Sequence, residues 1–209
     1  MENSEEKENE LKLRSFYVSA KQNLQNGNIE QAYEYFKKCE NIFGCAYCLF
    51  IMGEIDEALV LLNLIRNSSP AVNWLLALIS IIKGENTEIP SFLQIRNFYE
   101  NDLNMLIFYK NFEFTKKIFM NLSFLARYNK EVYKLTARVL LDNGAAQDAV
   151  MYLKKSIDIY YKDPEVHFIL AETYASLGDI EKAKKEYKTS NEVTGGYYPA
   201  EKKLREFNN

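Results

Sequence analysis

Two consecutive segments near the carboxyl end of the chain align with each other at a fixed offset of 34 residues. The matching small residues are Ala137, Gly144, Ala149 and Ser156 in the first segment, and Ala171, Gly178, Ala183 and Ser190 in the second. A repeat of this length is typical of a helix-turn-helix unit, which buries its apolar face only by stacking on neighbouring units. The pattern therefore predicts a stack of helix pairs that offers a binding surface rather than a reaction centre.

The second segment carries the clearest helix boundaries. Asp163 can accept hydrogen bonds from first-turn N–H groups, and Pro164 has no N–H to leave unpaired there, so a helix is expected to begin at this point. Gly178 can take the left-handed conformation that ends a helix, and Asp179 can cap the next one. Ala183 is expected at the close crossing of the two helices, where a large side chain would overpack.

This pattern resembles the tetratricopeptide repeat family over residues 130–193. The residues at the defining positions are His167, Leu170, Ala171, Tyr174, Gly178, Ala183 and Tyr187, with His167 in place of the usual Trp. The resemblance implies an all-α fold, a right-handed superhelical solenoid of antiparallel helix pairs, with about six pairs and a C-terminal capping helix. It implies a scaffold or peptide-binding role and no reaction.

The rest of the chain is interpreted as a single solenoid domain over residues 10–209. Clear repeats are expected at 10–41, 42–69, 130–163 and 164–197, degenerate pairs over 70–129, and a charged capping helix at 198–209. Within the degenerate part, separate helices are expected from Pro90 to about Glu100, at Asp102–Tyr109 and at Phe112–Tyr128, although a different local arrangement of helices also fits. Residues 1–9 are acidic and are expected to be disordered.

Composition argues against several classes of function. The net charge of −3 and the pI near 5.5 give no basic surface for nucleic acid. The acidic first residues do not resemble a signal peptide, and the longest apolar run, Trp74–Ile82, is far shorter than the roughly 20 residues that span a bilayer. Three clustered cysteines, an odd number, favour a reducing compartment. We therefore expect a cytoplasmic protein that binds neither nucleic acid nor membranes.

Few residues suggest catalysis or metal binding. The single histidine, His167, stands where the family places a packing aromatic, which favours a structural role. Cys45 and Cys48, with Cys39 nearby, have the only metal-like spacing, but zinc needs four ligands and buried thiols explain the three residues better. We expect no enzyme, no catalytic residue, no metal site and no cofactor.

The resemblance also places a candidate binding groove. In the family, the concave surface is lined by the first helix of each pair at repeat positions 2, 5, 9 and 12, which share one helix face. The corresponding residues are Arg14, Tyr17, Lys21, Phe43, Tyr47, Phe50, Trp74, Met105, Phe108, Lys134, Arg138, Phe168 and Glu172. They form an aromatic surface with cations toward both ends, and Lys134 with Arg138 could hold a partner's carboxylate. For Phe43, Phe50 and Trp74, core packing explains the pattern as well as a groove does.

Three roles are compatible with this surface. The first is a scaffold or adaptor whose groove binds a peptide or helix of a partner protein with acidic and apolar anchors, because Tyr, Trp and Arg often dominate binding energy. The second is a structural or self-associating subunit of a larger assembly with no open groove. The third is a regulatory or sensor subunit of an enzyme system. We expect the first role.

Overall fold

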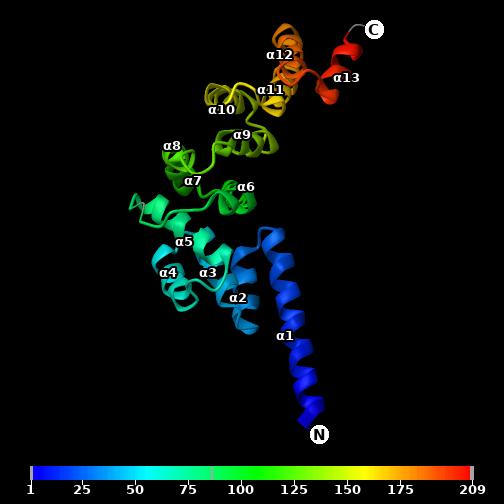
Figure 1. Cartoon of the computed structure of the whole chain (residues 1–209). Helices are drawn as coiled ribbons and strands as arrows, with labels where there is room; N and C mark the ends of the chain where they lie inside the picture. The colour runs from blue at the N-terminus through cyan, green and yellow to red at the C-terminus, as the bar shows by residue number, and fades with distance from the viewer. Residues whose placement is uncertain (1, 86, 208–209) are drawn as a thin grey trace. The chain divides into compact units, whose positions relative to one another are not determined.

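The computed structural model describes residues 2–85 and 87–207, and every regular element in this part of the chain is a helix (Figure 1). The helices are α1 (Glu2–Gln25), α2 (Ile29–Lys38), α3 (Ile42–Met52), α4 (Ile55–Leu64), α5 (Pro70–Lys83), α6 (Phe92–Phe108), α7 (Phe112–Met120), α8 (Leu122–Leu125), α9 (Val132–Asp142), α10 (Ala146–Ile159), α11 (Pro164–Ser176), α12 (Ile180–Glu192) and α13 (Tyr198–Glu206). Within the described ranges, none of the helices has the length and apolar character needed to cross a membrane.

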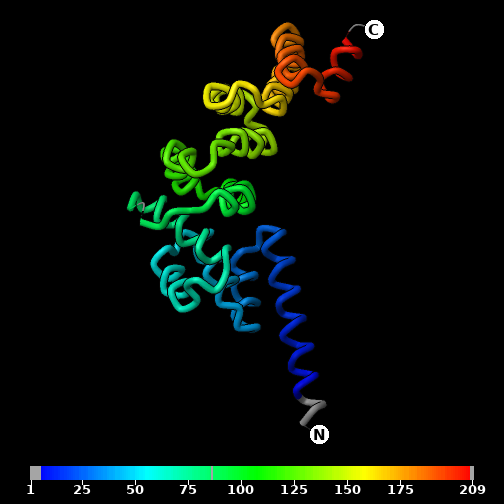
Figure 2. The backbone as a smooth tube through the Cα atoms, in the orientation of Figure 1, coloured from blue at the N-terminus to red at the C-terminus, as the bar shows by residue number. Residues whose placement is uncertain are grey.

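The chain divides into two compact units. Unit 1 comprises Met1–Gln94 and Asn101–Asn121, and unit 2 comprises Ile95–Glu100 and Leu122–Asn209, so the middle of α6 belongs with unit 2. In unit 1, α1 packs on α2, α2 on α3, and α3 on α4. In unit 2, α9 pairs with α10, α11 pairs with α12, and α13 packs on α12. Figure 2 traces these hairpins along the backbone. The expected stacking of helix pairs is confirmed within each unit.

The predicted boundaries of the last repeat are also confirmed. Asp163 accepts hydrogen bonds from two first-turn backbone N–H groups, at 3.0 and 3.3 Å, and α11 begins at Pro164. Gly178 follows α11 with a φ of +82°, a conformation that an L side chain adopts only with strain. Asp179 then caps α12 by accepting a backbone hydrogen bond at 3.2 Å. These short-range signals fix where both helices begin and end.

Ala183 is fully buried on α12, which packs against α11. We expect Ala183→Trp to lower the free energy of unfolding by about 1 to 3 kcal/mol, because the indole fits only if the two helices move apart. Urea denaturation measures the change, with Glu181→Trp as the control because Glu181 is exposed on the same helix. Equal midpoints for the two variants would mean that the helices do not cross at Ala183.

The helices between residues 92 and 125 differ from the expected ones. α6 is one continuous helix where two were expected. Its most buried side chains recur at helical spacing on both sides of the expected break and are Ile95, Tyr99, Leu103 and Leu106, each at most 1% exposed. The apolar face therefore continues through the break. The expected helix at 112–128 is divided into α7 and α8 at Asn121, whose side chain donates to the carbonyl of Lys117 at 2.9 Å.

The amino-terminal end also differs from the expectation. α1 begins at Glu2, so residues 2–9 are helical in the structure rather than disordered. Acidic residues are favourable near a helix N-terminus, and Glu and Lys are good helix formers, which accounts for the extra turns. At the other end, the expected capping helix is present as α13.

Candidate binding groove between α1 and α3

Five of the predicted groove residues come together in unit 1, between α1 and α3. They are Arg14, Tyr17, Lys21, Phe43 and Tyr47. Two cavities lie here, with volumes of about 490 and 160 Å³, and Tyr17 and Asn41 line both of them. The remaining lining residues are Leu13, Val18, Cys39 and Glu40 in the larger cavity and Leu24, Phe36 and Gly44 in the smaller. We call the surface formed by these residues the α1–α3 groove.

Local sequence explains how α3 presents its side of the groove. The side chain of Asn41 caps α3 by accepting a hydrogen bond from the backbone N–H of Gly44 at 2.6 Å. Phe43 and Tyr47, four residues apart, then share one face of the helix. Gly44 allows the close approach of α2, because a Cβ atom at this position would lie 2.4 Å from the ring of Phe36. The groove therefore depends on an asparagine cap and a glycine contact at the start of α3.

The lining of the groove is aromatic. The rings of Tyr17 and Phe36 meet edge to face with centroids 6.1 Å apart, and those of Phe43 and Tyr47 lie 6.2 Å apart. Tyr17 remains 42% exposed, and Phe43 and Tyr47 are partly exposed. Aromatic rings that are packed on one side and open on the other supply contact area at a low cost in side-chain entropy.

The rim of the groove is cationic. The ammonium of Lys21 lies 5.8 Å from the centroid of the Tyr17 ring, and Lys21 forms no ion pair with a carboxylate of the described residues. Arg14 pairs with Glu10 at 2.7 Å, and both side chains are exposed. Exposed pairs of this kind contribute about 0 to 1 kcal/mol, so Arg14 can exchange Glu10 for another carboxylate at little cost. Both cations are available to an acidic partner.

A buried carboxylate that the sequence analysis missed lies behind the groove. Asp102 of α6 accepts hydrogen bonds from the hydroxyl of Tyr47 at 2.6 Å and from the indole N–H of Trp74 at 2.5 Å. Burial raises the pKa of Asp102 to about 6, although both hydrogen bonds act in the opposite direction. The signal in the sequence is an acidic residue within the apolar face of α6, beside Leu103 and three residues after Tyr99.

Two predicted groove residues of unit 1 lie in the core instead. Phe50 and Trp74 are 0% and 1% exposed, which contradicts their placement on an open groove. The ring of Phe50 is covered by that of Phe114 in α7, 5.8 Å away. Phe108, 59% exposed, lies against the turn at Gly27, where an added Cβ would be 2.1 Å from its ring. Met105 is half-buried on α6. None of these four residues lines either cavity of the groove.

The predicted carboxylate-binding residues of unit 2 are already engaged within the chain. The ammonium of Lys134 lies 3.3 Å from Glu131, 3.0 Å from Asp163 and 2.8 Å from Glu165, and its side chain is 6% exposed. Burial by itself would lower the pKa of Lys134, but the hydrogen bonds that its ammonium donates to Glu165 and Asp163 outweigh this effect and raise the pKa. Arg138 is exposed and also pairs with Glu165, at 3.8 Å. The expectation that Lys134 holds a partner's carboxylate is therefore wrong.

The last two predicted groove residues contact the carboxyl-terminal part of the chain. The ring of Phe168 on α11 meets that of Tyr197, the residue before α13, with centroids 5.9 Å apart. Glu172 pairs with Lys203 of α13 at 3.6 Å. Both side chains are half-buried, because α13 and the residue that precedes it lie against them. The capping helix thus occupies the face of α11 on which a groove was expected.

The histidine and two of the cysteines are packed in the interior. His167 is buried, and its ring nitrogens contact Glu186 at 2.7 Å and the carbonyl of Tyr161 at 2.8 Å. Cys45 and Cys48 are buried free thiols, and burial raises the pKa of Cys48 to about 12. His167 is thus held in place by two polar contacts, and both thiols lie in the core.

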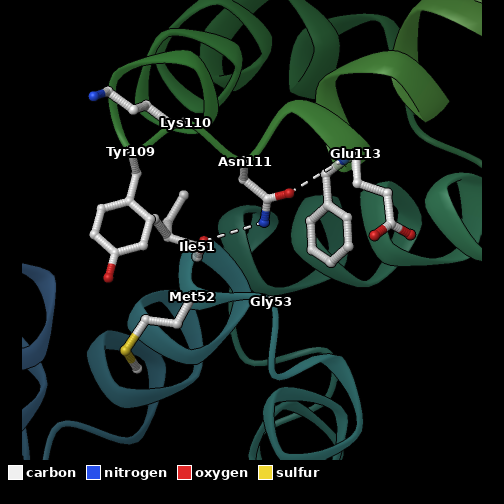
Figure 3. Close-up of a pocket in the computed structure, with 8 residues that line it drawn as sticks. Ile51, Met52, Gly53, Tyr109, Lys110, Asn111 and Glu113 are labelled. Carbon is white, nitrogen blue, oxygen red and sulfur yellow. Dashed lines mark hydrogen bonds between the residues drawn. The ribbon is translucent and has the colours of Figure 1, made fainter.

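A third cavity of unit 1, of about 320 Å³, lies between the α3–α4 turn and the α6–α7 turn (Figure 3). Asn111 donates a hydrogen bond to the carbonyl of Ile51 at 3.3 Å and accepts one from the backbone N–H of Phe114 at 3.2 Å. The asparagine side chain therefore ties the two turns together. No residue of the predicted groove lines this cavity.

A comparison with known families agrees with a helical repeat in the carboxyl-terminal part of the chain. Residues 140–196 match the family model described as tetratricopeptide repeat. No curated protein matches the chain in sequence. Among solved structures, a MamA mutant is 16% identical over 88% of this chain and 99% of its own, with a TM-score of 0.36. MamA AMB-1 is 16% identical over 90% and 94%, with a TM-score of 0.38.

The matched segment runs from the end of α9 through α12 and includes the helices whose caps were predicted. Stacked helical repeats of this kind form extended concave surfaces that bind other molecules. The chain is therefore a helical protein in which residues 140–196 match the tetratricopeptide repeat model.

Proposed function

We propose that the protein is an interaction scaffold whose α1–α3 groove binds a peptide segment or a helix of a partner protein. The observation that carries the proposal is the cluster of Tyr17, Phe43 and Lys21 around cavities that no described side chain fills. An apolar side chain of the partner would enter between the rings, and a neighbouring carboxylate would meet Lys21. The partner segment is therefore amphipathic, with apolar and acidic residues.

The two cavities set the spacing of the partner's anchors. They adjoin at Tyr17 and Asn41, so they accept two neighbouring apolar side chains from one segment. Residues three or four apart on a helix project in the same direction and meet this requirement. Arg14 at the larger cavity and Lys21 at the smaller one place a cation beside each anchor.

Charge reversal at the rim tests the proposal. We expect Lys21→Glu to weaken the binding of an acidic peptide about fivefold to tenfold. Reversing one exposed charge contact changes the binding free energy by about 1 kcal/mol or slightly more. Fluorescence anisotropy is measured with a labelled helical peptide that carries leucines four apart and flanking glutamates. Lys12→Glu is the matched control, since Lys12 is exposed on the same helix and lines neither cavity.

Two results would count against the groove. Equal affinities for Lys21→Glu and Lys12→Glu would remove Lys21 from the site, and an absence of peptide binding up to about 1 mM would remove an acidic amphipathic partner. A second copy of the chain could occupy the groove instead. Light scattering of the wild-type protein would then show a mass that rises with concentration, and Tyr17→Ala would abolish the rise.

A cytoplasmic location completes the proposal. Cys39, Cys45 and Cys48 are all free thiols, which is the state that a reducing compartment maintains. The near-neutral net charge of −3 favours a protein partner over a nucleic acid.

A further inference from the structure

We propose that Asp102 is a positioning residue for the α1–α3 groove: it fixes the ring of Tyr47 through the tyrosine hydroxyl and thereby lets α6 control how the groove binds its partner. This inference rests on the proposed function of the groove. It assigns a role to a residue that does not contact the partner but makes the affinity of the groove depend on pH.

The geometry places Tyr47 between the groove and the carboxylate. Its ring lines the smaller cavity together with Tyr17 and Lys21. Its hydroxyl donates to one oxygen of Asp102 at 2.6 Å, while the indole of Trp74 donates to the other oxygen at 2.5 Å. Asp102 thus joins α6 to α3 and α5, and the orientation of one wall of the cavity depends on it.

The carboxylate is held at a cost in stability. Asp102 is 7% exposed, and none of its contacts within the described residues is an ion pair with a Lys, Arg or His side chain. A buried charge that has hydrogen bonds but no counter-charge destabilises the folded protein relative to an apolar side chain of similar volume. Core packing alone therefore gives no reason for an acid at this position, whereas fixing the Tyr47 hydroxyl does.

The protonation state of Asp102 decides how firmly Tyr47 is held. The groups that face the carboxylate are the Tyr47 hydroxyl from α3 and the Trp74 indole from α5. The pKa of Asp102 is raised to about 6 by burial, so the group is ionised at pH 7 and becomes protonated a little below pH 6. Protonation removes the negative charge that strengthens the hydrogen bonds from Tyr47 and Trp74, because bonds to an ionised acceptor are roughly twice as strong as neutral ones. The Tyr47 ring is held less firmly, and binding to the groove weakens.

Trp74 provides a direct test, because it is the only tryptophan in the chain. We expect its fluorescence emission to change in one step with a midpoint near pH 6, because its indole N–H is bonded to the titrating group. The step should be absent in Asp102→Asn. In Tyr47→Phe it should remain but move to higher pH, since the lost hydrogen bond stabilised the ionised form. A step that persists unchanged in Asp102→Asn would overturn the inference.

The binding test separates this inference from the function on which it rests. The acidic leucine peptide should bind the wild-type protein about threefold or more weakly at pH 5.5 than at pH 7, and Asp102→Asn and Tyr47→Phe should remove that pH dependence. The peptide's glutamates stay ionised over this range. Circular dichroism confirms that each variant is folded.

The combination of results shows which of the two claims fails. Loss of affinity in Lys21→Glu together with pH-independent binding by the wild type would overturn the role of Asp102 and leave the groove in place. Unchanged affinity in Lys21→Glu, Asp102→Asn and Tyr47→Phe would overturn both. Loss of the pH dependence in Asp102→Asn but not in Tyr47→Phe would show that Asp102 acts without Tyr47, against the inference.

Discussion

Lys134→Met is expected to lower the free energy of unfolding by about 1 to 3 kcal/mol, because it removes a buried cation whose carboxylate partners are partly screened by solvent. The ammonium of Lys134 lies within 3.3 Å of Glu131, Asp163 and Glu165, and methionine would leave these three carboxylates close together with only the more distant Arg138, 3.8 Å from Glu165. Asp163 also caps α11, so the repulsion acts on the boundary between the last two repeats. Urea denaturation followed by circular dichroism measures the loss.

The control for this prediction is Lys130→Met, which makes the same change at an exposed site. It is expected to change the free energy of unfolding by less than about 0.5 kcal/mol. If Lys134→Met were as stable as this control, the ammonium of Lys134 would be free in solution. The original expectation that it binds a partner's carboxylate would then be restored.

Asp102→Asn is expected to remove about 3 kcal/mol of pH-dependent stability between pH 4 and pH 6. The pKa of Asp102 is about 6 in the folded protein and near 3.8 in an unperturbed side chain, so the folded state binds the proton more tightly. The stability that Asp102 contributes is therefore present below about pH 4 and is lost as pH rises through 6. The size follows from about two pKa units at 1.36 kcal/mol each.

Urea unfolding of the wild type and Asp102→Asn at several pH values isolates this effect, because the other titrating groups are common to both proteins. As the pH is raised from 4 to 6.5, the unfolding free energy of the wild type should decrease relative to that of Asp102→Asn. Parallel curves would show that Asp102 is not a buried carboxyl group with a raised pKa.

The local parts of the fold were predictable because their signals lie within a few residues of one another. Asp163, Pro164 and Gly178 act on backbone groups of their own turns, and the structure confirms each of them. The expected division between Glu100 and Asp102 is absent, because α6 runs through these residues as one helix. The apolar face on either side continues in register, and this longer-range periodicity decides the outcome.

Only part of the candidate site was predictable from the sequence. Helical spacing shows on which face of a helix a side chain lies, but it does not show which other elements cover that face. Tyr17 and Phe43 stay open, whereas Phe50, on the same helix as Phe43, is covered by α7 from far along the chain. Lys134 was placed on the correct helix, but Asp163 and Glu165 reach it from 29 and 31 residues away. The partners of a buried charge cannot be found from spacing within a single repeat.

Photo-cross-linking from position 17 tests the central claim most directly. A benzophenone amino acid replaces Tyr17, and the protein is irradiated with the acidic leucine peptide. The α1–α3 groove predicts a cross-link from this position that weakens in the Lys21→Glu background and is absent when the benzophenone replaces Tyr160, an exposed tyrosine of unit 2. Equal yields from the two positions, or none from position 17 while the peptide binds, would contradict it.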